Sequence, residues 1–268
     1  MPTTTTDRHR AGPNWPFWVA IAAVTAAYLA FLLYMLLATA TYTSRDHLIR
    51  SLGSREIRYA MGLSLITCTT TSLLALLIAV PVGYLMSRSH FFGKNFIDTL
   101  IDIPIVLPPL VIGLCLLIMF QTPFGQAIQQ HVRFTYTVTG VVLAQLVVGA
   151  AFAVRQMRST FDHLSARPED VAMTLGCSRG RAVWLVTLPA AKRGMFSAAS
   201  VAWARSLGEF GPILVFAGAT RMKTEVLPTT VWLELSVGNL EASVAVSLTM
   251  IVLAVIVLLA MRVAGERP

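Results

Sequence analysis

Long apolar stretches without a charged residue set the strongest limit on how this chain can fold. Phe17–Ala40 has 24 uncharged residues, and Met61–Met86, Val138–Val154 and Ala242–Met261 are also uncharged. A helix needs about 20 consecutive apolar residues to cross the hydrocarbon core of a bilayer. Only 13% of the residues are charged, against about 25% in an average soluble domain. We therefore expect an all-α protein that crosses the membrane several times.

The run Thr99–Phe120 is expected to cross the membrane as a kinked helix. It is interrupted by Pro104, Pro108 and Pro109, and Asp102 lies near its start. Each proline removes a backbone donor, and a bilayer tolerates the freed groups only where neighbouring protein satisfies them. This segment should therefore lie inside the helix bundle.

Together with the interrupted run Gly194–Ala219, the sequence predicts about six transmembrane helices. With both termini in the cytoplasm, 13 Lys and Arg residues lie on the inner side and 7 on the outer side, in agreement with the positive-inside rule. This bias also accounts for the net charge of +8 without nucleic acid. The expected segments are a tail over 1–16, a first helix over 17–40, a core over 41–262 and a tail over 263–268.

The first run has one alternative interpretation, and the loop that follows it has an unusual charge. A cleaved signal peptide would fit the small residues at 38–40, but its apolar region usually has only 7–15 residues. The following external loop is the exception to the charge rule, and we expect a short amphipathic helix there at the outer surface. Its basic residues are Arg45, Arg50, Arg55 and Arg58.

The connection 155–193 is the longest and most basic one, with seven basic and three acidic residues. Pro168, followed by two carboxylates, predicts the start of a short helix that Gly176 ends. A second short helix is expected after Ser178, ending before Pro189, because proline disfavours helical geometry in the residue before it. So short a loop cannot cover all its apolar side chains, so some should contact the membrane helices or a partner protein.

The spacing within this connection resembles the EAA loop of ABC importer permeases. In that pattern EAA is followed by three residues, Gly, nine residues, Ile, one residue and Leu-Pro. The resemblance implies that the loop inserts into a groove of a separate ATP-hydrolysing subunit, with Asp170, Ala172 and Gly176 at the contact face and turn. The matching residues are Asp170, Val171, Ala172, Gly176, Val186, Leu188 and Pro189, with Asp for Glu, Val for the first Ala and Val for Ile.

Two charged residues lie within the apolar run 194–219. Arg205 and Glu209 are four residues apart, so a helix places them on one face, which also carries Ala198 and Ala202. Burying either charge alone costs at least about 2.5–3.5 kcal/mol on insertion scales. We expect the two to pair and to point into the bundle. The pair either serves only to hold helices together or belongs to the transport pathway. For the second case we favour a gate or hinge over a residue that binds the substrate directly, because each charge is already neutralised by the other.

The segment 205–211, with the sequence RSLGEFG, resembles the R-[AS]-[LV]-G-E-[FY]-G motif of the molybdate and sulfate branch of these permeases. Residues 106–113 and 222–228 are similar to that branch's proline pair and external loop. The resemblance implies a bundle like that of type I ABC importer permeases. Its pathway or gate would comprise Arg205, Gly208, Glu209, Phe210 and Gly211, and its kinked pathway helix Pro104, Pro108 and Pro109.

The resemblance implies the transmembrane subunit of an ATP-driven oxyanion importer in the cell (inner) membrane. Its partners would be an ATP-binding subunit, an extracytoplasmic oxyanion-binding protein and a second permease. Molybdate is the expected substrate and sulfate the alternative: Phe210 favours molybdate or tungstate, whereas the sequence 222–225 favours sulfate. The permease pair would be a homodimer for molybdate and a heterodimer for sulfate. Alternatives are an ion-coupled secondary carrier and a scaffold without transport.

The sequence has no motif for catalysis or for a cofactor. It lacks the GxxxxGK[ST] phosphate loop and the HExxH metal motif. All five histidines lie outside the apolar runs, and the three cysteines have no CxxC spacing. We therefore expect no enzyme activity and no metal site in this chain.

Overall fold

The computed structural model describes residues 15–43 and 45–266, and all regular structure in these residues is helical. The chain divides into two compact units, Met1–Ser44 and Arg45–Pro268. In the first unit, α1 (Trp15–Tyr42) has 28 residues and no charge, so it is about 42 Å long at 1.5 Å per residue. It is long enough to cross a hydrocarbon core of about 30 Å, as predicted for this run. Nearly all of the expected tail 1–16 lies outside the described residues.

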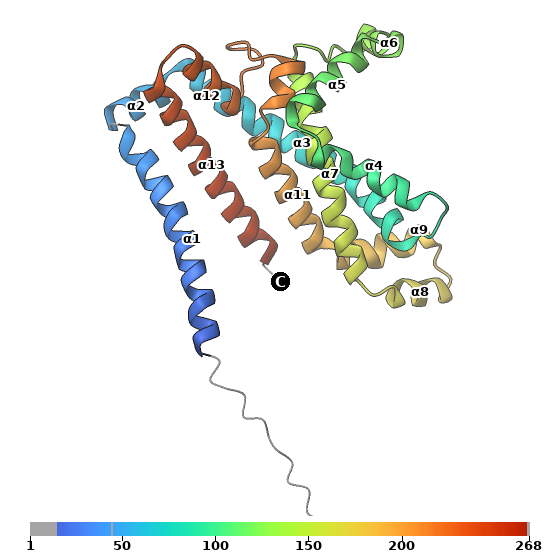
Figure 1. The fold of residues 1–268 in the computed structure, drawn as a ribbon. Coiled ribbons are helices and arrows are strands. Elements are labelled where there is room, and N and C mark those ends of the chain that lie inside the picture. Colours follow the sequence, from blue (N-terminus) through green and yellow to red (C-terminus); the bar gives the residue numbers. More distant parts are fainter. Residues whose placement is uncertain (1–14, 44, 267–268) are drawn as a thin grey trace, which may run out of the picture. The chain divides into compact units, whose positions relative to one another are not determined.

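Three long helices form the centre of the second unit. They are α3 (Arg55–Arg88), α7 (Val138–His163) and α11 (Lys192–Leu207), which pack against one another (Figure 1). Gly83 lies so close to α7 that an added Cβ would come within 2.8 Å of the Met157 Cβ. Small residues are the usual means by which membrane helices approach closely. The buried alanines of these three helices are Ala60, Ala75, Ala79, Ala144, Ala151, Ala153, Ala198 and Ala202.

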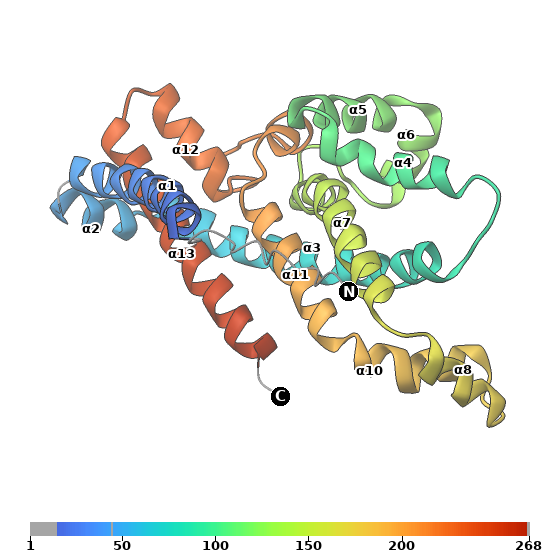
Figure 2. The same ribbon diagram turned by 60° about the horizontal axis from the view of Figure 1, so that its bottom comes forward.

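Further helices flank this centre on two sides (Figure 2). One group consists of α2 (Arg45–Gly53), α12 (Leu227–Ser236) and the long α13 (Leu240–Glu266). The other consists of α4 (Lys94–Val106), α5 (Pro109–Gln121), α6 (Pro123–His131) and the π-helical segment η2 (Ile213–Ala217). Between α7 and α11 the chain forms α8 (Arg167–Thr174), α9 (Arg179–Ala182), the π-helical η1 (Val183–Thr187) and α10 (Leu188–Ala190). The helix expected in the first external loop is α2.

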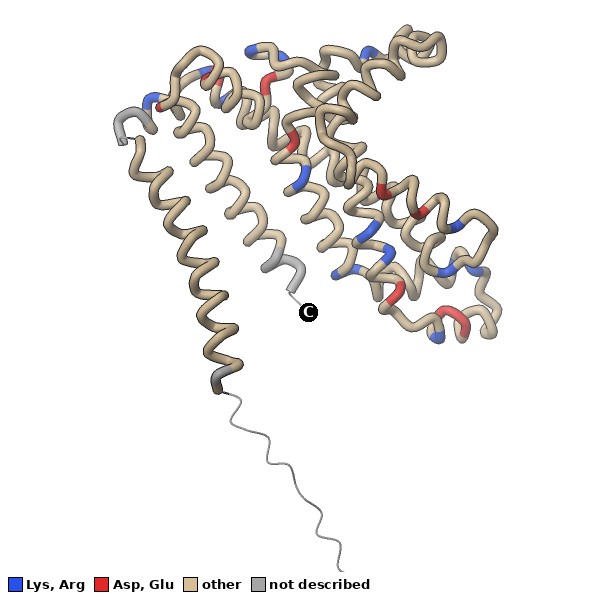
Figure 3. The backbone as a smooth tube through the Cα atoms, viewed as in Figure 1, with Lys and Arg blue, Asp and Glu red and all other residues tan. Residues whose placement is uncertain are grey.

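Among the described residues, four helices are long and apolar enough to cross a membrane, or five if the bent pair α4 and α5 counts as one span. Charged residues are nearly absent from α1 and α13 along their length (Figure 3). The run 194–219, expected as a further span, is not one continuous helix. Its helix α11 has 16 residues, about 24 Å at 1.5 Å per residue, and η2 follows after a turn.

The expected kinked helix is broken more sharply, and at fewer prolines, than predicted. Helix α4 continues through Pro104 to Val106, so this proline does not break it. The break lies at Leu107, whose backbone is extended (φ −65°, ψ 140°) because Pro108 follows it, and α5 leaves at 112° to α4. The prediction that the whole segment lies inside the bundle was also wrong for this chain, because α4 buries no residue, whereas α5 does.

The second helix of the loop 155–193 does not end before Pro189, so that prediction was wrong. Leu188 keeps helical dihedral angles (φ −65°, ψ −44°), and its N–H donates to the carbonyl of Val183, five residues earlier. This π-helical turn takes up one extra residue, so the helical path continues through the proline into α11. At the other end of the chain, α13 extends to Glu266, so part of the expected tail 263–268 is helical.

Candidate functional site

Within the predicted loop 155–193, residues 155–163 are the end of α7 and residues 192–193 the start of α11, so the loop itself is shorter than predicted. It consists of two short helical arms joined by a tight turn. Helix α8 ends at Thr174, and Gly176 follows with φ +92°, a left-handed conformation that glycine adopts without strain. Ser178 precedes α9 with an extended backbone, although its side chain makes no capping hydrogen bond. The sequence thus predicted both arms and the turn between them.

The outer face of this loop exposes large apolar side chains. Leu175 is 81% exposed and Trp184 71% exposed, and Val171 and Leu185 are exposed beside them. A soluble surface rarely carries so many neighbouring apolar groups unless another protein or a membrane covers them. Of the other residues predicted in this loop, Asp170, Gly176 and Pro189 are exposed, whereas Ala172, Val186 and Leu188 are half-buried.

The inner face of the loop is fixed to α3 by a carboxylate that the sequence analysis missed. Glu169 is only 5% exposed, and its Oε1 accepts a hydrogen bond from the Tyr84 hydroxyl of α3. Its Oε2 accepts one from the Thr187 hydroxyl of η1 at 2.9 Å. One side chain therefore ties both arms of the loop to the membrane helices. No spacing rule connects residues this far apart, and the neighbouring Asp170 fitted the motif better.

A second candidate region lies where two broken segments face each other. Gly211, at the break between α11 and η2, leaves no room for a Cβ, which would lie 2.9 Å from both the Leu110 nitrogen and the Pro109 Cβ. In the same way, a Cβ on Gly113 of α5 would lie 2.8 Å from the Pro212 Cα. The breaks at Pro108–Pro109 and Gly211–Pro212 are thus in direct contact, which the sequence did not predict.

Arg205 and Glu209 form the expected ion pair, next to these breaks. Arg205 Nη2 lies 3.6 Å from Glu209 Oε2, and the Glu209 side chain is 2% exposed. The Arg205 side chain is 43% exposed, and its guanidinium carbon lies 4.8 Å above the ring of Phe152. Its Nε is buried and makes no hydrogen bond with any described residue. Only the acidic partner is therefore fully inside the unit, whereas the arginine lies at its edge.

A buried polar network next to the ion pair links the three central helices. The side chain of Gln145 in α7, 1% exposed, accepts a hydrogen bond from the Thr71 hydroxyl at 3.1 Å and donates one to the Ser206 carbonyl at 3.1 Å. Each of the three central helices thus contributes one partner. The Thr71 hydroxyl thus bonds to another helix, whereas the Thr67 hydroxyl donates to the Ser64 carbonyl of its own helix.

Ion pairs connect α4 to the centre, and another ion pair stabilises the segment before α12. Asp98 and Asp102 of α4 pair with Arg158 and Arg155 of α7, respectively. Near α12, Arg221 Nη2 donates to Glu234 Oε1 at 2.7 Å, and this hydrogen bond raises the pKa of the guanidinium. Arg221 therefore keeps its charge at any physiological pH. None of these pairs was predicted.

In the described part of the chain, no three His, Cys, Asp or Glu side chains are grouped so that they could hold a metal ion. The three cysteines are free thiols.

Sequence comparison relates this chain to membrane transport proteins. Residues 79–267 match the family described as the binding-protein-dependent transport system inner membrane component. The probable molybdenum ABC transporter permease protein of Haloferax volcanii is 35% identical over 205 residues, which cover 76% of this chain and 74% of that protein. The molybdenum transport system permease protein ModB of Mycobacterium tuberculosis is 32% identical over 250 residues, 92% of each chain. The molybdate/tungstate transport system permease protein WtpB of Thermococcus kodakarensis is 37% identical over 172 residues, which cover 64% of this chain and 66% of that protein.

The fold also matches a solved structure. A chain in the crystal structure of a bacterial alginate ABC transporter, in complex with an alginate pentasaccharide-bound periplasmic protein, has a TM-score of 0.76 with this chain. The match covers 95% of both chains at 14% identity, so it concerns the fold alone. It confirms the predicted all-α bundle of the ABC importer permease type.

Proposed function

Because this chain belongs to the family of inner membrane permeases of binding-protein-dependent ABC importers, we propose that it imports molybdate or tungstate. The permease is a multi-pass membrane subunit without catalytic activity of its own, and its family works with an ATPase and a periplasmic binding protein. The names of the relatives and Phe210 in the motif 205–211 support molybdate or tungstate as the substrate. Sulfate is the alternative that the segment 222–225 favours.

The loop 155–193 is the proposed docking site for the ATPase. The observation that carries this assignment is the contrast between its two faces: Leu175 and Trp184 are exposed on the outer side, whereas Glu169 anchors the inner side. An apolar face on a fixed support is suited to a partner that must exert force. The residues proposed to contact or shape this docking site are Asp170, Val171, Ala172, Gly176, Val186, Leu188 and Pro189.

Continuous helical hydrogen bonding gives a route from this loop to the ion pair. The Ala191 N–H donates to the Thr187 carbonyl and the Met195 N–H to the Ala191 carbonyl, both at 2.9 Å, so hydrogen bonds bridge the single turn residue between α10 and α11. A displacement of α9 by ATP binding would therefore move α11 and Arg205 at its far end. This is the mechanical link that alternating access needs when the ATPase is a separate subunit.

The gate is proposed to lie where the broken segments meet, at Arg205, Gly208, Glu209, Phe210 and Gly211 opposite the break at Pro108 and Pro109. In the paired state the charge of Arg205 is neutralised by Glu209. Movement of α11 that separates the two would free the guanidinium, which binds oxyanions well because its donors match their oxygens. Pro104 lies within α4 and is not needed for this gate.

Two copies of this permease would form the path if the substrate is molybdate, and two different permeases if it is sulfate. We place both termini and the loop 155–193 in the cytoplasm, which agrees with the excess of Lys and Arg there. The core would extend from 41 to 262, preceded by the helix of the first unit.

Gly176→Trp tests the docking site directly. The added ring would project from the turn into open space, because no atom lies within 4 Å of a Cβ at this position, and it would block the partner. We expect the purified permease to insert normally but to lose ATPase binding and stimulated hydrolysis. Gly93→Trp is the matched control, because Gly93 also has positive φ (+85°) and open space but lies in a different loop. Equal ATPase binding by the two variants would contradict the proposed docking site.

A further inference from the structure

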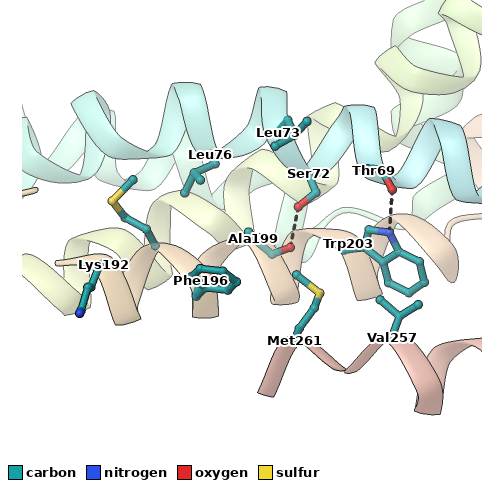
Figure 4. Close-up of a pocket in the computed structure, with 11 residues that line it drawn as sticks. Thr69, Ser72, Leu73, Leu76, Lys192, Phe196, Ala199, Trp203, Val257 and Met261 are labelled. Carbon is teal, nitrogen blue, oxygen red and sulfur yellow. Dashed lines mark hydrogen bonds between the residues drawn. The ribbon is translucent and has the colours of Figure 1, made fainter. Parts of the chain in front are cut away.

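An apolar groove of ≈ 490 Å³ lies between α3, α11 and α13 (Figure 4), and neither the ion pair nor the residues of the two breaks line it. Its volume is within the range of about 300–1,000 Å³ that is usual for small-molecule pockets. The side chains that form most of its wall are Leu73, Leu76, Met195, Phe196, Val257 and Met261.

The uncharged polar side chains in the wall of this groove already form hydrogen bonds within the chain. Ser72 donates its hydroxyl hydrogen to the Ala199 carbonyl at 2.7 Å, and the Trp203 indole N–H donates to the Thr69 hydroxyl at 3.4 Å (Figure 4). An anion or a hydrated substrate would find no matching donors among these residues. The groove is therefore suited to a hydrocarbon chain and not to the transported oxyanion.

One end of the groove carries positive charge. Lys192 lies at that end of the row of residues contributed by α11, and Trp203 lies toward the other end (Figure 4). These two residues are 11 positions apart, about 17 Å along a helix at 1.5 Å per residue. That length is close to half of a hydrocarbon core of about 30 Å, which is one leaflet. Neither Lys192 nor the adjacent Arg193 forms an ion pair with a described acidic side chain.

We propose that this groove holds an acyl chain of an anionic phospholipid from the inner leaflet, with Lys192 binding the phosphate of the headgroup. The apolar wall fits the chain, the single-leaflet length sets its depth, and the unpaired cation fits the headgroup charge. A helix from a second copy would fill the wall but leave Lys192 without a counter-ion. The choice of leaflet rests on the proposed orientation of the loop 155–193.

Because α11 also carries Arg205, the bound lipid would pack against the moving helix and stabilise one of its positions. The lipid site is independent of the identity of the transported oxyanion.

Fluorescence quenching by brominated lipids tests this site in the full-length chain in liposomes. Trp203 is kept as the only tryptophan, with Trp15, Trp18, Trp184 and Trp232 replaced by Phe. Trp203 lines the groove and is only 4% exposed, and bromine quenches at short range, so strong quenching requires a bromine atom in or directly beside the groove. We expect half-quenching at a mole fraction of brominated phosphatidylglycerol about fivefold lower than that of brominated phosphatidylcholine, the contribution of about one lysine at a membrane surface.

Substitutions at Lys192, Lys94 and Ala199 make this test specific. Lys192→Gln should remove the preference for phosphatidylglycerol, whereas Lys94→Gln, near the start of α4, should keep it. Ala199→Leu should narrow the groove and weaken quenching by both lipids. Equal half-quenching by the two lipids, or an unchanged preference in Lys192→Gln, would overturn the proposal. The proposal would also be overturned if Leu73→Cys formed a disulfide between two copies of the chain and brominated lipids failed to quench Trp203. That result would show that a second copy fills the groove. The quenching experiment does not measure transport, so the lipid proposal can fail while the proposed transport function holds, and the reverse.

Discussion

At the scale of single residues, the ion pair Arg205–Glu209 is asymmetric. Glu209 is almost completely buried, whereas 43% of the Arg205 side chain is exposed beside Phe152. Removing the arginine therefore leaves a buried carboxylate without its counter-charge, whereas removing the acid leaves a cation that water can reach. The two residues are not equivalent in their contribution to stability.

A double-mutant cycle measures this asymmetry. We expect Arg205→Ala to destabilise the chain by about 1–3 kcal/mol, the usual cost of a buried group that loses its partner. Arg205→Ala combined with Glu209→Gln should cost less than Arg205→Ala alone, because the neutral amide needs no counter-charge. Thermal unfolding of the detergent-solubilised variants gives the comparison. Additive costs would show that the two side chains do not interact.

Two glycines of the same motif provide a matched pair of substitutions. An added Cβ at Gly211 would lie 2.9 Å from Pro109, but at Gly208 the nearest atom would be 3.9 Å away. Gly208 has φ −84°, which any residue adopts. We therefore expect Gly211→Ala to cost about 1–3 kcal/mol through overpacking and to impair transport, and Gly208→Ala to be tolerated. Similar transport rates for both would mean that contact between the two breaks is not required.

At the scale of elements, the loop 155–193 depends on its attachment to α3. The hydrogen bond from Tyr84 to Glu169 joins a transmembrane helix to the arm that carries the exposed apolar face. If this face transmits force, a weaker attachment should reduce the force that reaches α11 without removing the docking surface.

Tyr84→Phe removes this hydrogen bond and keeps the ring, which also packs against Phe161 at 5.6 Å. Hydrogen bonds to a charged group contribute about 1.5–3 kcal/mol. We expect the ATPase to remain bound while fewer oxyanions are transported for each ATP hydrolysed. Tyr59→Phe is the control. Tyr59 lies near the start of α3, and its hydroxyl donates to the Lys223 carbonyl and not to the loop. An unchanged transport ratio in Tyr84→Phe would show that this attachment is not part of the coupling.

Features with a short spacing in the chain could be predicted from the sequence, whereas contacts between distant segments could not. The turn at Gly176 and the pair Arg205–Glu209 follow from local patterns, and the structure contains both. Glu169, Gln145 and Gly211 act through partners from other helices, which no local pattern identifies. The errors at Pro104 and Pro189 have one cause: proline disfavours a helix but does not forbid it, and a π-helical turn accommodates Pro189.

At the scale of the whole molecule, the discontinuous segments separate this chain from a simple bundle of membrane-spanning helices. The breaks between α4 and α5 and between α11 and η2 are in contact, and non-helical backbone at membrane depth is tolerated only where protein or a water-filled cavity surrounds it. Family membership decides against the ion-coupled carrier, since permeases of this family draw their energy from a separate ATPase.

Uptake by the assembled complex in proteoliposomes, with the ATPase, the binding protein and labelled molybdate, tests the central claim most directly. We expect uptake that requires ATP and all three components, with unlabelled tungstate competing more strongly than sulfate. Uptake by this chain alone without ATP would contradict the importer mechanism. Stronger competition by sulfate would contradict the proposed substrate.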